Sequence, residues 1–151
     1  MDYTKFDEMI NGAELAKEVK ELDANGGRSD APEIPDDTYE VKLVKLELVE
    51  NKKGLPMVKV AFSILKGKYK GLWTWNNYNV SYGRAMHNLH ELLRSMETNV
   101  SIEYHGNFAD YADMLADVLE EVNGKVGFAL VQGADDKGYK TFKIEDSWLL
   151  D

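Results

Sequence analysis

The sequence predicts a mainly β fold with helices, of the α+β class, and two observations lead to this prediction. First, the 151 residues contain five segments of strand-like composition, and two helical segments separate the third from the fourth. Second, the apolar positions of the first strand candidate change parity partway along. Such a change is typical of a strand that bends to serve two sides of a small barrel.

Residues 38–50, TYEVKLVKLELVE, are expected to form the first strand, with a bulge or sharp bend where the parity changes. The apolar residues there are first Tyr39, Val41 and Leu43, and then Val44, Leu46 and Leu48. Residues 57–65 are expected to form the second strand, whose alternation places two sets of side chains on opposite faces. One face carries Val58, Val60, Phe62 and Ile64, and the other carries Met57, Lys59, Ala61 and Ser63. After the turn GKYKG, the third strand is expected at about residues 69–79.

The remaining elements are two helices and a hairpin. They are expected at residues 83–96 (helix), 108–124 (helix), 125–133 (strand) and 139–150 (strand). Asn123-Gly124 is a typical helix end, and Trp148 and Leu149 are expected to pack as part of the last strand. This order matches an OB-like five-stranded antiparallel barrel with a helical segment between strands three and four. An ordinary α+β sheet with two helices on one face is the alternative.

Three segments of the chain differ in composition. Residues 1–22 show apolar positions at helical spacing and are expected to form an amphipathic helical segment. Residues 23–37, rich in Gly, Pro and Asp, are expected to form a linker, and residues 38–151 the OB-like domain. The apolar stripe of the first segment needs cover, from its own barrel or from a second subunit, so a homo-oligomer is one expected arrangement.

Several classes of function are excluded or disfavoured by what the sequence lacks. It contains no cysteine, so disulfides and thiolate metal sites are excluded. No secretory signal and no membrane-spanning run is visible, and we expect a soluble, cytoplasmic protein with no membrane partner. His87 and His90, with His105 beyond them, could share a metal, but a solvated helix face explains them as well. We therefore expect no enzyme, no metal and no cofactor.

The charge is unevenly distributed along the chain. Overall it is −9, yet residues 38–84 hold nine bases and three acids, a net charge of +6. Lysines there could contact phosphates, and Trp73 and Trp75, two residues apart on a strand, would form a same-face platform on which bases stack. The candidate nucleic-acid-binding residues are Trp73, Trp75, Lys59, Lys70, Lys42, Lys52, Lys53, Lys68 and Tyr78. The alternatives are a lysine-rich solvated face and a pair of indoles that fill the barrel interior.

The segment IPDDTYEVKLVKLELVENKKGLPMVKVAFSILKGKYKGLWTWNNYNV and the helix ending in LLRSM resemble a family of small phage proteins. The family is long catalogued as a domain of unknown function, and its members are described as single-stranded-DNA-binding proteins encoded among replication and recombination genes. The N-terminal DYTKFDEM and ELDANGG are similar to the family's leader. The resemblance implies an OB-type fold, nucleic-acid binding in the host cytoplasm, and phage replication or recombination proteins as partners.

The sequence thus favours a non-catalytic protein that binds single-stranded nucleic acid, DNA rather than RNA, during phage replication or recombination. A protein–protein interaction or assembly protein with no nucleic-acid role is the alternative, in which the lysine-rich strands would face a neighbouring subunit. A small hydrolase or metal protein is the third hypothesis, and no phosphate-binding glycine loop or catalytic motif supports it.

Overall fold

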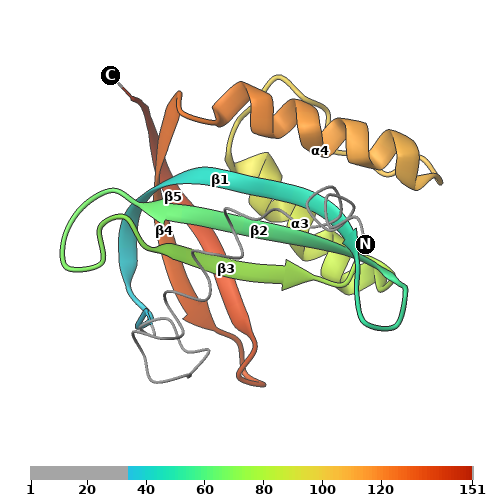
Figure 1. Ribbon diagram of the computed structural model, residues 1–151, viewed down its shortest axis with the longest axis horizontal. Coiled ribbons are helices and arrows are strands. Elements are labelled where there is room, and N and C mark those ends of the chain that lie inside the picture. Colours follow the sequence, from blue (N-terminus) through green and yellow to red (C-terminus); the bar gives the residue numbers. More distant parts are fainter. Residues whose placement is uncertain (1–33, 151) are drawn as a thin grey trace, which may run out of the picture. The chain divides into compact units, whose positions relative to one another are not determined.

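Each strand and helix expected after residue 37 is present in the computed structural model, which describes residues 34–150 (Figure 1). The elements run in the order β1 (Thr38–Glu50), β2 (Pro56–Ile64), β3 (Trp73–Tyr78), α3 (Gly83–Ser95), α4 (Phe108–Val122), β4 (Val126–Ala134) and β5 (Lys140–Leu149). The start of β3 differs most from its prediction, because the turn before it extends to Leu72 and uses Gly67 and Gly71 at positive φ. The predicted helical segment 1–22 and most of the linker 23–37 lie outside the described residues.

The strands form a single antiparallel sheet in the order β3-β2-β1-β4-β5. A mainly β fold with two helices between the third and fourth strands is therefore confirmed for this part of the chain. The sheet is open, not a closed barrel, because β3 and β5 are edge strands with no ladder between them. Figure 1 shows β4 and β5 crossing behind β2 and β3, so the sheet curls strongly. The side chain of Asn76 bridges the two edges by donating from Nδ2 to the carbonyl oxygen of Lys140 over 3.1 Å.

The predicted bulge in β1 is confirmed at the predicted place. Leu43 pairs with Phe62 and Lys45 pairs with Ala61, so Val44 is an extra residue opposite β2. Inward positions therefore change parity, and Val41, Leu43 and Leu46 are all buried. Without the extra residue, the alternation would turn Lys45 and not Leu46 toward the core.

The core lies between the inner face of the sheet and the two helices. Phe62 of β2 is fully buried and meets Phe128 of β4 and Phe142 of β5 edge-on, with ring centroids 6.4 and 5.4 Å apart. The inward face predicted for β2 is confirmed, because Val58, Val60, Phe62 and Ile64 are at most 2% exposed. The predicted packing of Leu149 is wrong, since this residue is 82% exposed. No helix within residues 34–150 is long and apolar enough to cross a membrane.

A buried polar contact joins the two helices. His90 of α3 lies with Nε2 2.9 Å from the hydroxyl of Tyr111 on α4, and both residues are buried. Loss of hydration lowers the pKa of His90, and Coulombic interactions with Arg94 and with His87 lower it further. Burial likewise raises the pKa of Tyr111 to about 12. Both groups therefore stay neutral at physiological pH, which suits a contact inside the core.

The lowered pKa of His90 predicts a pH dependence of stability. In the unfolded chain His90 takes up a proton near its ordinary pKa of about 6.5, whereas in the folded protein it resists protonation. The contribution of neutral His90 to the free energy of unfolding should therefore be fully present above the unfolded pKa. It should be lost as the pH falls from there through the lower pKa of the folded protein. Replacing His90 with Gln should flatten this decrease between about pH 7 and pH 5, measured by urea denaturation.

His105→Gln is the matched control, because this exposed histidine pairs with Glu103 at 3.2 Å and is not among the groups that shift the pKa of His90. An H90Q profile as steep as that of the unsubstituted protein would show that another group controls the acid response.

Candidate functional site

Trp73 and Trp75 lie on the outer face of the sheet, opposite the core. The register of β1, β2 and β3 defines this surface, because directly paired residues point to the same side. It is called the tryptophan face here and consists of Lys42, Lys45 and Glu47 of β1, Lys59, Ala61 and Ser63 of β2, and Trp73, Trp75 and Asn77 of β3. Its three strands lie within residues 38–84, the segment whose net charge is +6.

The two indoles face solvent. Trp73 is 45% exposed and Trp75 38% exposed, and their ring centroids are 5.5 Å apart with the planes tilted by 47°. Each pairs with a small residue of β2, Ser63 and Ala61 respectively, and both small residues are buried. The pair thus rests on a shallow part of the sheet and presents aromatic surface outward. The interpretation that both indoles fill the interior is wrong.

Three lysines accompany the indoles on the tryptophan face. Lys42 lies opposite Ser63 and Lys59 lies opposite Asn77, so these two predicted site residues are on the same face as the aromatic pair. Lys45 was not among the predicted site residues, yet its Nζ lies 5.5 Å from the ring centroid of Trp75 in a cation–π arrangement. The change of parity in the sequence of β1 could have predicted Lys45. If Val44, Leu46 and Leu48 face inward, alternation places Lys45 on the outer face.

The charge of this face is positive and only partly neutralised. Lys45 forms an ion pair of 3.3 Å with Glu47, the acid of the face. Among residues 34–150, no carboxylate lies within ion-pair distance of Lys42 or Lys59. These two ammonium groups are therefore available to an anionic ligand.

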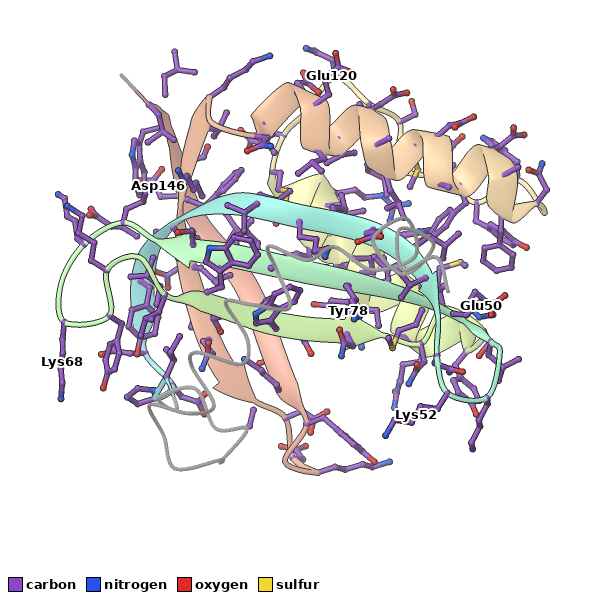
Figure 2. All side chains as sticks on the ribbon, viewed as in Figure 1. Glu50, Lys52, Lys68, Tyr78, Glu120 and Asp146 are labelled. Carbon is purple, nitrogen blue, oxygen red and sulfur yellow. The ribbon has the colours of Figure 1, made fainter. Side chains whose placement is uncertain are left out.

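The other predicted lysines lie in two turns at opposite ends of β2. Lys52 and Lys53 belong to the β1–β2 turn, and Lys68 and Lys70 to the β2–β3 turn; Figure 2 shows Lys52 and Lys68 at opposite ends of the sheet. A strand of nine residues spans roughly 30 Å, so the two turns cannot serve one compact site. They could extend a long path across the face.

Tyr78 does not belong to the tryptophan face. Its position on β3 has the opposite parity to Trp73 and Trp75, and it is only 8% exposed. Burial raises the pKa of Tyr78 to about 12. In this structure its ring belongs to the core side of the sheet, so the expectation that it offers an exposed stacking surface is corrected.

Trp148 of β5 lies on the same side of the sheet as the two exposed indoles. The register runs from Trp73 through Ser63, Lys42 and Gly127 to Trp148, one residue from each strand. A Cβ atom on Gly127 would stand 2.6 Å from Nε1 of Trp148, so the indole packs directly on the backbone of β4. Pairing across β1 and β4 decides this position, and no local pattern in the sequence could have shown it.

A cleft lies where the sheet edges meet. It occupies about 930 Å³ between the end of β3, one side of α3 and the start of β5. Its lining includes Asn76, Asn79, Tyr82, Arg84, Asn88, Tyr139 and Lys143. Sequence reasoning did not identify this cleft, because its walls are formed by segments that are far apart along the chain.

The histidines form no metal site within the described residues. His90 is buried against Tyr111, whereas His87 is exposed, and His105 pairs with Glu103 at 3.2 Å. No group of three or more potential ligands among His, Asp and Glu residues occurs in residues 34–150.

Replacing Gly127 with Ala should displace the indole of Trp148. The new methyl group would lie 2.6–2.7 Å from two indole atoms, so the ring or the strand must move, at a cost of about 1–3 kcal/mol in stability. In a W73F/W75F background, where Trp148 alone reports, its emission should shift to longer wavelength and the melting temperature should fall. Gly133→Ala, on the same strand with its nearest neighbour 3.5 Å away, should change neither. Equal behaviour of the two variants would contradict the packing.

The sequence was compared with known families and proteins. A family model described as "Protein of unknown function (DUF669)" matches residues 20–143, which include every strand except the end of β5. No curated protein matches the chain. The resemblance to a domain catalogued without a function is thus confirmed, while single-stranded-DNA binding stays a prediction. This chain belongs to the DUF669 family of proteins of unknown function.

Proposed function

We propose that this chain is a non-catalytic single-stranded-DNA-binding protein that holds its ligand on the tryptophan face. The observation that carries the proposal is the pair of exposed indoles, 5.5 Å apart, among lysines of the same face. Stacking of a base on an aromatic side chain contributes about 1–3 kcal/mol and tolerates any base. Lysines along the same path supply contacts to phosphates, and these contacts add affinity without sequence preference.

The strand order supports an OB-like fold as the framework of this site. β1 pairs with both β2 and β4, the helices lie between β3 and β4, and the edges β3 and β5 approach each other through Asn76 and Lys140. We interpret the sheet as an OB-like arrangement that is open between these edges. In that fold the face of strands two and three, with the loops joining strands one–two and four–five, binds oligonucleotides. Here the indoles and Lys59 lie on those two strands.

The biological setting rests on the family resemblance of the sequence. It favours a role in phage replication or recombination in the host cytoplasm, with DNA preferred to RNA and with phage proteins of the same module as partners. A homo-oligomer would extend the basic path from one copy to the next. Catalysis has no part in this proposal, because stacking and charge neutralisation require no reacting group.

Binding of labelled oligo-dT across a salt series tests the proposal. The logarithm of affinity should fall linearly with the logarithm of salt concentration, with a slope of about −0.7 for each phosphate contacted. Lys42→Ala and Lys59→Ala should each weaken binding and make the slope shallower by about that amount. Lys125→Ala is the control, since this lysine follows α4 and its Nζ contacts the carbonyl oxygen of Glu120.

Absence of any binding at micromolar protein in low salt would overturn the proposal. The face would then fit the alternative, a protein–protein interaction or assembly protein, whose partner would cover the same indoles. Binding with no dependence on salt would equally contradict phosphate contacts by Lys42 and Lys59.

Replacing Trp73 or Trp75 with Ala should weaken oligo-dT binding by about 1–3 kcal/mol, roughly 5-fold to 150-fold, because each change removes a stacking surface. Since both indoles are well exposed, the loss of stability should be smaller than the 3–5 kcal/mol typical of a buried aromatic residue. Fluorescence anisotropy and thermal melting, measured on the same samples, separate the two effects.

Tyr104→Ala is a matched control, because Tyr104 is 38% exposed but lies beside Phe108 of α4, away from β3. If W73A or W75A melts at a much lower temperature while its folded fraction binds with unchanged affinity, the replaced indole is not part of the binding site.

A further inference from the structure

The cleft between β3, α3 and β5 adjoins the tryptophan face. Asn77 belongs to both surfaces, since it pairs with Lys59 on the face and also lines the cleft. It follows Trp75 by two residues on β3, a distance of about 6.6 Å along the strand. A strand of nucleic acid that stacks on Trp75 can therefore reach the cleft without leaving the protein surface.

One wall of the cleft is a polar stripe on α3. Arg84, Asn88, Glu91 and Ser95 follow one another at spacings of four, three and four residues, so they lie on the same side of the helix. Residues 76–79, at the end of β3, continue this wall with three asparagines. Within the described residues, the side-chain amides of Asn79 and Asn88 have no hydrogen-bond partner in the protein. These amides are free to bond a ligand.

The charged groups of the cleft leave its cations available. The two acids are already engaged: Glu91 pairs with His87, and Oδ1 of Asp135 accepts from the backbone N–H groups of Lys137 and Tyr139 at 2.9 Å. Arg84 and Lys143 have no carboxylate within ion-pair distance in residues 34–150. Arg84 and Lys143 can therefore pair with an anionic ligand without first breaking an ion pair.

Lys140 also lines the cleft, but its ammonium group already has partners in the protein. Its Nζ donates to Oγ1 of the buried Thr74 over 3.0 Å, and loss of hydration lowers the pKa of Lys140 although Asp36 opposes the shift. We therefore assign the anionic part of a ligand to Arg84 and Lys143.

Two tyrosines stand at the cleft with much of their rings exposed. Tyr82 precedes α3 and is 61% exposed, while Tyr139 lies before β5 and is 69% exposed. Aromatic rings, free amides and guanidinium or ammonium groups are the side chains with which proteins bind single-stranded bases, their edges and their phosphates. The cleft volume of about 930 Å³ is ample for one nucleotide.

We propose that this cleft binds a single nucleotide of the strand held on the tryptophan face and reads its base through Asn79 and Asn88. The inference rests on the proposed function and deepens it. The tryptophan face contributes affinity that every base shares, whereas amide groups distinguish bases by their donors and acceptors. The protein should accordingly show a base preference, although stacking on the indoles alone would produce almost none.

Affinities for oligo-dA, oligo-dC, oligo-dG and oligo-dT, measured by fluorescence anisotropy, test the proposal. The unsubstituted protein should prefer one of the four by about tenfold, and N79A/N88A should remove most of this preference while keeping the salt dependence. W75A should instead weaken binding to all four alike. Asn123→Ala, an exposed asparagine at the end of α4, should leave the preference unchanged. A preference that survives in N79A/N88A, with the melting temperature unchanged, would overturn the assignment.

Titration with deoxynucleoside monophosphates, followed by NMR, tests the cleft independently of strand binding. The side-chain amide signals of Asn79 and Asn88 should shift with a nucleotide and not with inorganic phosphate. If no oligonucleotide binds yet these signals shift, the proposed function fails while the nucleotide site stands. If oligonucleotides bind but no mononucleotide shifts these signals, the cleft inference fails while the proposed function stands.

Discussion

The extra residue in β1 is the constraint on which both surfaces of the sheet depend. β1 is the central strand and pairs with β2 over residues 41–50 and with β4 over residues 38–42. The bulge at Val44 allows Leu43 and Leu46 to point inward on its two sides, and therefore places Lys42 and Lys45 outward. With strict alternation, one half of the strand would direct charged side chains into the core, which costs far more than a local bend. The same local irregularity thus completes the core and brings two lysines to one face.

The open junction between β3 and β5 is held by side chains where a closed barrel would have a backbone ladder. Asn76 bonds the backbone of Lys140, and the hydroxyl of buried Thr74 donates to Gln132 and accepts from the ammonium group of Lys140. A few such bonds keep the edges close but leave room beside them, and the cleft occupies that room. Edge strands have unpaired backbone groups that can pair with other chains. The side-chain bonds at this junction therefore also protect the two edges from such pairing. The open junction between β3 and β5 and the cleft beside it therefore have the same structural origin.

Part of the unpaired positive charge of this acidic chain lies beside the exposed aromatic groups. Lys45 and Lys66 pair with Glu47 and Glu40, whereas Lys42 and Lys59 remain unpaired among the described residues. Long-range repulsion from a net charge of −9 opposes any polyanion, and local cations must overcome it. If the chain binds single-stranded DNA as proposed, this opposition would weaken non-specific adhesion, and stacking would select single strands, whose bases are accessible, over duplexes. Charge alone would not discriminate in this way.

The sequence by itself determined the order and bounds of most elements, the bulge in β1 and the shared side of Trp73 and Trp75, because these follow from periodicity within single segments. Parity alone could also have separated Tyr78 from the two indoles. Which side of β3 faces solvent required the partners of that strand, since alternation is symmetric until a core is present. Trp148 joined the same face only through the register of four ladders, and the cleft arose from segments 76–95 and 135–144 brought together by folding. Such contacts depend on long-range pairing, which no local pattern specifies.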